Sequence, residues 1–162
     1  MKFTRMALAA GIAGTCATLV AGCSPPKPVA AAPQPPFNAS LSVPEFMTHV
    51  MEPSAERFWD GSGVMVDRQG IRDLAPTTEA GWKSLEDGAA GVAEAGNALM
   101  IPGRARAPVA DWYRHAAQLS KAALEAKAVA EKHEKASLIE VGGKIDEACV
   151  SCHKQFWPGS EG

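Results

Sequence analysis

The sequence predicts an all-α protein: an antiparallel four-helix bundle, with a short β-hairpin between the first two helices. Between residues 42 and 158 the apolar side chains recur every three or four positions, which is the spacing of one helix face. Clusters of Gly, Pro and Ser divide this stretch into four segments of helical length. The connections between these segments are short, and short connections place consecutive helices antiparallel.

The first helix is predicted to begin after Ser42, whose hydroxyl caps the helix while Glu45 completes a capping box. We expect it to run to Trp59 with a kink near Pro53, because proline lacks the N–H that a helix interior needs. The Gly-Ser-Gly sequence at 61–63 ends it.

A β-hairpin is expected next, with strands at 64–66 and 71–73 joined by a polar turn at 67–70. The second helix follows Thr77 or Thr78 as its cap. Its apolar face steps by three and four residues along Trp82, Leu85, Ala89, Val92, Gly96 and Leu99.

The third helix is expected from about Val109 to His133, after a turn at 101–103. Its apolar stripe consists of Trp112, Ala116, Leu119, Ala123, Ala126 and Ala130. The fourth is expected from about Ala136 to Trp157. Its apolar side carries Leu138, Val141, Ile145, Cys149, Cys152 and Phe156.

The fourth helix contains the most informative motif, the C-x-x-C-H sequence Cys149-Val150-Ser151-Cys152-His153. This spacing is the attachment site of a c-type haem, in which two thiols bind the porphyrin and the imidazole binds iron. On a helix, Cys152 lies about 60° behind Cys149 and His153 about 40° ahead of it, so all three share one face. A redox dithiol requires a strand-to-helix turn and a zinc half-site requires a second pair of ligands, and the sequence offers neither. We therefore predict one covalently bound haem c with His153 as its proximal ligand.

The chain begins with an export signal: Lys2 and Arg5 precede an apolar run that ends in small residues directly before Cys23. This ending resembles a bacterial lipobox, which implies cleavage after residue 22 and lipidation of Cys23. Ordinary secretion with Cys23 as an incidental thiol is the alternative. Cys16 leaves with the signal, so no pair of cysteines remains for a disulfide. We expect a periplasm-facing protein held to a bacterial membrane, with the outer membrane among the options.

Residues 23–41 form a lipid-anchored, Pro-rich tether with six prolines and almost nothing to bury. The folded domain occupies 42–158, and 159–162 form a C-terminal tail. Without the signal, 14 basic residues face 18 acidic ones, a net charge of −4. No basic stripe is present, which argues against nucleic acid as a partner.

The second axial ligand of the iron must come from upstream, because the nine residues after His153 include no Met or His. The C-terminal C-x-x-C-H on the last of four predicted helices resembles the class II cytochromes c, the cytochrome c′ group. The resemblance implies that the distal position faces the first helix, which offers Met47 and Met51. These lie about 40° apart on a helix, whereas His49 points away. We favour Met47, with Met51 as the alternative because the kink makes its direction harder to predict.

Arg104 and Arg106 are candidates to neutralise the haem propionates, since Arg forks suit carboxylates. A solvated loop is the competing interpretation. We expect His115 and His133 at the surface of the third helix. The tryptophans are expected to pack in the core or against the haem; they are Trp59, Trp82, Trp112 and Trp157.

These features predict an electron carrier, not an enzyme, because the chain has no acid–base pair, nucleophile triad or phosphate loop. Its partners are redox proteins whose identity the sequence does not specify, and the oligomeric state stays open, a homodimer included. The alternative function is a five-coordinate haem that binds a diatomic gas such as nitric oxide. A third alternative is a lipoprotein subunit in which haem only completes the fold.

Overall fold

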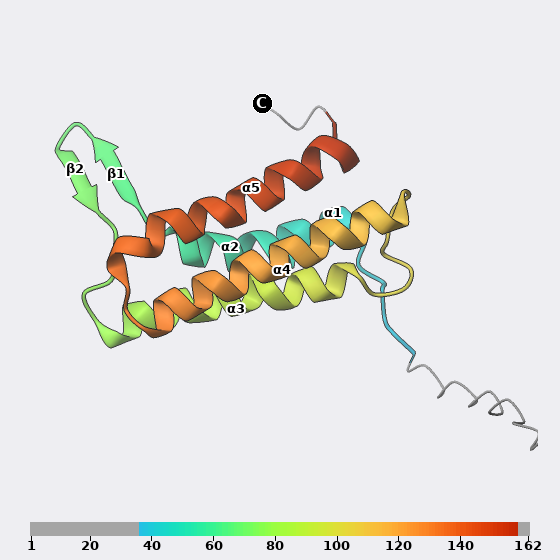
Figure 1. The fold of residues 1–162 in the computed structure, drawn as a ribbon, viewed down its shortest axis with the longest axis horizontal. Coiled ribbons are helices and arrows are strands. Elements are labelled where there is room, and N and C mark those ends of the chain that lie inside the picture. Colours follow the sequence, from blue (N-terminus) through green and yellow to red (C-terminus); the bar gives the residue numbers. More distant parts are fainter. Residues whose placement is uncertain (1–35, 159–162) are drawn as a thin grey trace, which may run out of the picture. The chain divides into compact units, whose positions relative to one another are not determined.

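The structure, a computed structural model, describes residues 36–158. The predicted signal, Cys23, most of the predicted tether and the tail at 159–162 lie outside the described residues. The described chain is helical apart from one antiparallel hairpin (Figure 1). Its elements are α1 (Val43–Phe46), the π-helical turn η1 (Met47–Met51), α2 (Glu52–Trp59), β1 (Val64–Asp67), β2 (Gly70–Asp73), α3 (Glu79–Leu99), α4 (Val109–Glu131), the 3₁₀ turn η2 (Lys135–Ser137) and α5 (Leu138–Phe156).

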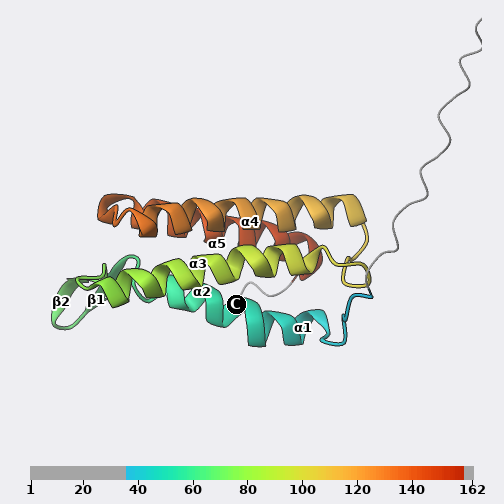
Figure 2. The same cartoon turned by 90° about the horizontal axis from the view of Figure 1, so that it is seen from below.

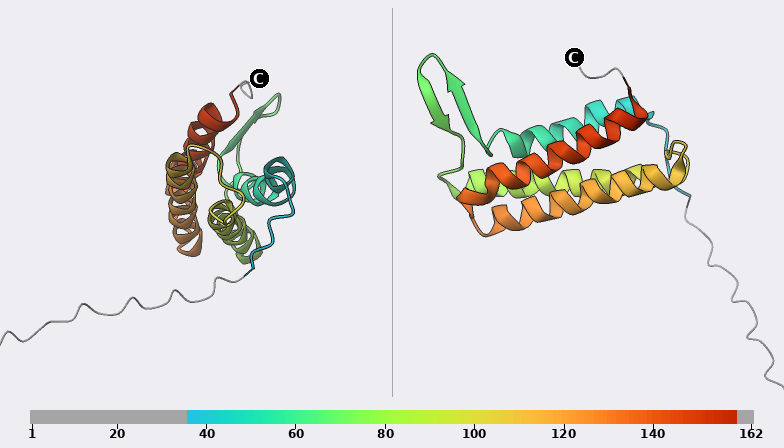
Figure 3. Two further views of the ribbon diagram at one scale, coloured as in Figure 1. Left: turned by 90° about the vertical axis from the view of Figure 1, so that its right-hand side faces the viewer. Right: turned by 45° about the horizontal axis from the view of Figure 1, so that its top comes forward.

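The long helices pack in chain order: α2 along α3, α3 along α4, and α4 along α5. Helix α4 runs opposite to α3 and to α5 (Figure 1). Seen end-on, α2 and α5 stand at the two ends of this series (Figure 3, left). The backbones of α1, η1 and α2 do not come as close to that of α5 as the backbones of consecutive long helices come to one another. No helix among residues 36–158 is both long and apolar enough to cross a membrane.

The start of the first helical segment is as predicted. The Ser42 hydroxyl accepts the Glu45 N–H at 3.4 Å, and the Glu45 carboxylate accepts the Ser42 N–H at 2.9 Å, which completes the capping box. The predicted disturbance near Pro53 takes the form of the turn η1, in which the Glu52 N–H bonds to the Met47 carbonyl five residues back. A π turn just before a proline relieves the clash of its ring with the preceding turn. The segment then continues to Trp59, where it was expected to end.

The hairpin is also confirmed, with Val64 opposite Asp73 and Val66 opposite Ile71. All its residues are exposed, so it adds nothing to the core. It extends away from the helices (Figures 1 and 2).

Helix α3 begins after Thr78, whose hydroxyl accepts the Gly81 N–H at 3.1 Å. The predicted stripes of α3 and α4 are buried at every position. Helix α4 ends two residues before His133, which adopts the left-handed conformation (φ 55°) that commonly follows a helix. The centre of the core is formed by Phe58, Leu85, Val92, Leu138 and Ile145.

Helices α3 and α4 approach closely because Gly96 has no side chain. A Cβ atom there would touch the Ser120 hydroxyl and lie 3.0 Å from the Ala116 carbonyl oxygen. The Ser120 hydroxyl donates to the Ala93 carbonyl at 2.9 Å, so the polar atom at this contact is satisfied. This contact lets the backbones of α3 and α4 approach closely.

Candidate functional site

The C-x-x-C-H residues lie in the last two turns of α5, inside one continuous α-helix. The side chains of Cys149, Cys152 and His153 are each half-buried, and both thiols are free. The first half of α5 differs, because Leu138, Val141 and Ile145 are fully buried. The helix is therefore anchored by its first half and presents thiols and an imidazole from its second.

Burial raises the pKa of Cys149 to about 11, and the nearby Asp146 and Cys152 add to the rise. Burial also raises the pKa of Cys152, against an opposing effect of Arg106. The negative end of the α5 dipole lies at the same place. Redox-active dithiols depend on a lowered thiol pKa, so this environment does not suit one. A thioether carries no ionisable proton and is stable under such burial.

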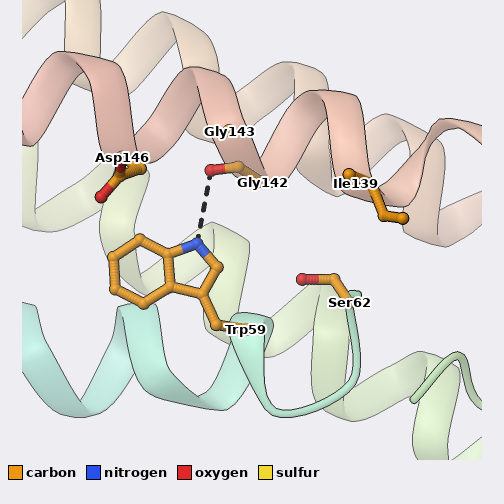
Figure 4. Close-up of a pocket in the computed structure, with 6 residues that line it drawn as sticks. All are labelled: Trp59, Ser62, Ile139, Gly142, Gly143 and Asp146. Carbon is orange, nitrogen blue, oxygen red and sulfur yellow. Dashed lines mark hydrogen bonds between the residues drawn. The ribbon is translucent and has the colours of Figure 1, made fainter. Parts of the chain in front are cut away.

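The side of α5 that carries His153 also borders an open hollow. Gly142, Asp146, Cys149 and His153 lie within about 60° of one another on the helix. Around Gly142 the hollow has a volume of about 240 Å³ and is lined by Trp59, Ser62, Ile139, Gly142, Gly143 and Asp146 (Figure 4).

The floor of this hollow is the end of α2. The Trp59 indole nitrogen donates to the Gly142 carbonyl at 3.3 Å, and the buried Ser62 hydroxyl has no partner among the described residues (Figure 4). A Cβ atom at Gly143 would meet nothing within 4 Å. The hollow lies beside the first half of α5 and is not lined by Cys149, Cys152 or His153. Two thiols one turn apart with an imidazole beside them are what covalent attachment of a haem requires. The residues present therefore fit that group.

The methionines of the predicted distal side both belong to η1. Met51 is 5% exposed and forms part of the core, whereas Met47 packs against the core and is only partly buried. His49 between them is exposed, as its helical position predicted. η1 packs on α3, and its backbone does not run close to that of α5.

The two candidate propionate ligands have different surroundings. Arg104 is 9% exposed, donates from Nη1 to the Ala98 carbonyl at 3.0 Å, and holds its guanidinium 4.6 Å from the Phe46 ring centre. Arg106 is exposed and donates from Nη1 to the Phe156 carbonyl at 3.5 Å, beside the C-x-x-C-H turns. The solvated-loop interpretation is wrong for Arg104, because its side chain ties the α3–α4 connection to α1.

The prediction for His115 was wrong: it is 4% exposed and contacts α5. Its Nε2 lies 2.9 Å from Gln155 Oε1 and its Nδ1 lies 3.3 Å from the Ser151 hydroxyl. Its spacing of three from Trp112 placed it at the edge of the buried stripe, which was the available signal. His133 follows α4, is partly exposed, and stacks on Trp82 with ring centres 4.7 Å apart.

The tryptophans divide into two groups. Trp82 and Trp112 are buried, as expected of core residues. Trp59 is half-buried at the hollow, and Trp157 is 60% exposed with its ring edge-to-face to His153 at 5.5 Å. Within residues 36–158, no group of three or more His, Cys, Asp and Glu side chains is placed to hold a metal ion by itself.

A scan against protein-family models gave no match, and searches of curated proteins and of solved structures gave none either.

Proposed function

We propose that this protein is a c-type cytochrome that carries single electrons, built as an antiparallel four-helix bundle of the class II kind. The observation that carries the proposal is the C-x-x-C-H sequence within α5, with free, half-buried thiols and an imidazole on one side of the helix. The raised thiol pKa values, given above, argue against the competing dithiol interpretation.

Each residue of the site has a distinct role in this proposal. Cys149 and Cys152 hold the porphyrin by thioether bonds, each formed by adding S–H across a vinyl group, so no atom is lost. His153 supplies the proximal nitrogen. Bound haem supplies a one-electron Fe(III)/Fe(II) couple. Arg106, beside the end of α5, is better placed than the buried Arg104 to neutralise a propionate.

We propose Met47 as the distal ligand and Met51 as the alternative. Met51 already fills the core, whereas Met47 keeps part of its surface outside it. A thioether sulfur opposite histidine favours Fe(II) and raises the reduction potential. Cys23 carries the lipid, the tether links it to the haem domain, and the partners are redox proteins in the periplasm.

Covalent attachment is tested by mass spectrometry after acid-acetone extraction. We expect the native chain to keep one haem, and Cys149→Ser with Cys152→Ser to lose it. Ser151→Ala, inside the same pentapeptide, is the matched control and should keep the haem. Pigment that leaves the native protein, or a mass without haem, would contradict the proposal.

The distal ligand is tested by absorption spectra of the reduced protein. We expect Met47→Ala to change a low-spin iron into a high-spin one that binds carbon monoxide readily, and Met51→Ala to leave the spin state unchanged. A change in Met51→Ala alone would reverse the ligand assignment. If the native iron is already five-coordinate, binding of a diatomic gas becomes the better function.

The lipid anchor is tested by membrane fractionation and detergent-phase partition. Cys23→Ser should release the protein from membranes and leave its haem spectrum unchanged. An unmodified Cys23 in the native protein would disprove the anchor without affecting the haem proposal.

A further inference from the structure

The buried His115 of α4 joins the C-terminal turns of α5 through a chain of hydrogen bonds. Gln155 Nε2 donates to Asp111 Oδ2 at 2.8 Å, and Gln155 Oε1 lies 2.9 Å from His115 Nε2. On its other side, His115 Nδ1 lies 3.3 Å from the Ser151 hydroxyl. One ring thus contacts two residues of α5 that are four positions apart.

The direction of these bonds follows from Asp111. Asp111 is ionised at neutral pH, as an aspartate with an ordinary pKa is, and an ionised carboxylate only accepts hydrogen bonds. Gln155 must therefore turn its NH₂ group toward Asp111 and its carbonyl oxygen toward His115. Consequently Nε2 of His115 carries the proton, and Nδ1 accepts from the Ser151 hydroxyl.

The contacts are placed around the haem-binding residues. Ser151 lies between the two cysteines, and Gln155 lies two residues after His153. In this half of α5 the thiols are only half-buried, so apolar packing holds the helix less firmly than at Leu138 or Ile145. Phe156 adds edge contacts, 6.0 Å from the His115 ring centre and 5.1 Å from that of Trp112.

We propose that His115 is a positioning residue for His153. By holding Ser151 and Gln155, it fixes the rotation of the helical turn that presents the proximal imidazole, and so tunes the reduction potential of the iron. Outer contacts that orient a ligand are known to tune the metal it binds. This inference rests on the proposed covalent haem, and a merely stabilising role for His115 is the competing explanation.

The test is a double-mutant cycle on the haem-loaded protein with His115→Ala, Ser151→Ala and the pair. The readouts are the midpoint potential and the electron paramagnetic resonance signal of the ferric haem. We expect both single variants to shift the potential in the same direction, and the second substitution to lose its effect in the pair. His115→Asn, which offers an acceptor near the Nδ1 position, should restore part of the shift.

His133→Gln is the matched control, because His133 is partly exposed and lies outside the network. It should leave both readouts unchanged. Wild-type potentials and signals in His115→Ala and Ser151→Ala, with only a lower melting temperature, would overturn the inference. If His115→Ala does not fold, the midpoint potential and the resonance signal of Ser151→Ala, compared with those of the wild type, test the inference. Absence of covalent haem in the wild type would instead overturn the proposed function together with the inference.

Discussion

The contact between α3 and α4 and the side where α2 meets α5 are built on opposite principles. The first is closed by backbone against backbone at Gly96, Ala116 and Ser120. The second is bridged by the Trp59–Gly142 hydrogen bond and contains a hollow of about 240 Å³. The same chain therefore combines a contact with no room for an added methyl group and a side that leaves an open hollow beside the first half of α5.

This difference separates the most closely packed part of the fold from a part that is packed less closely. Close-packed elements open least often, whereas regions with few buried apolar contacts open more readily and more often carry function. The C-x-x-C-H residues are only half-buried, in the second half of α5, and none of them lines the hollow.

The largest effect on stability is expected from adding a side chain at the close contact between α3 and α4. Gly96→Val should lower the free energy of unfolding by about 3 kcal/mol, because its side chain overlaps the Ser120 hydroxyl and the Ala116 carbonyl. Urea denaturation measures it. The same change at Gly143, where an added Cβ meets nothing within 4 Å, is the control and should cost almost nothing. Equal costs at the two glycines would refute the contrast between the two sides.

The next effect compares one tryptophan from each side. Trp112→Phe should lower the free energy of unfolding by about 1–3 kcal/mol, since its indole nitrogen donates at 2.7 Å to the Leu99 carbonyl, which ends α3 and has no partner within the helix. Trp59→Phe should cost only about 0.5–1 kcal/mol, because the Gly142 carbonyl lies inside α5 and keeps its helical bond. Thermal and urea unfolding of both variants give the comparison, and a larger loss at Trp59 would reverse it.

A gain in stability is expected on the open side. Gly143→Ala should raise the free energy of unfolding of the haem-free protein by about 1 kcal/mol, the difference in helix propensity at an exposed position. Gly142→Ala should gain at least as much, because its Cβ would make ordinary contacts with the Ser62 hydroxyl at 3.4 Å and the Phe58 ring at 3.5 Å and would be buried between them. A loss of stability at Gly142 would show that these neighbours leave no room for a methyl group.

The smallest expected effect is a loss of stability at low pH, which arises from the hydrogen bonds of Asp111 between α4 and α5. Gln155 first and Arg114 second lower the pKa of Asp111 in the folded protein. The stabilisation is therefore present above the unfolded value of about 3.9 and is lost as pH falls through the lower folded value. Urea midpoints measured from pH 5 to pH 2 should fall less steeply in Asp111→Asn than in the native protein. Parallel curves would show that the network does not lower the pKa of Asp111.

The parts of the fold that local sequence controls were predicted well. Ser42 and Thr78 cap their helices as expected, because a hydroxyl at that position reaches N–H groups only three residues away. The stripes of α3 and α4 were correct because the period of the helix alone decides which positions share a face. The misjudged residue was His115, whose partners are set by packing between elements, and packing likewise buries Arg104 where a solvated loop was the competing interpretation.

The sequence by itself determined the helices, the hairpin and the placing of the C-x-x-C-H residues on one helix face, since each follows from residues within a few positions of one another. Only the tertiary structure decided which side of the molecule is closed and which is open. It also decided that His115 meets Ser151 and Gln155, and that Trp59 meets Gly142, 83 residues away. Periodicity shows that a helix face is buried but not what buries it, because that depends on how helices distant in the chain pack together.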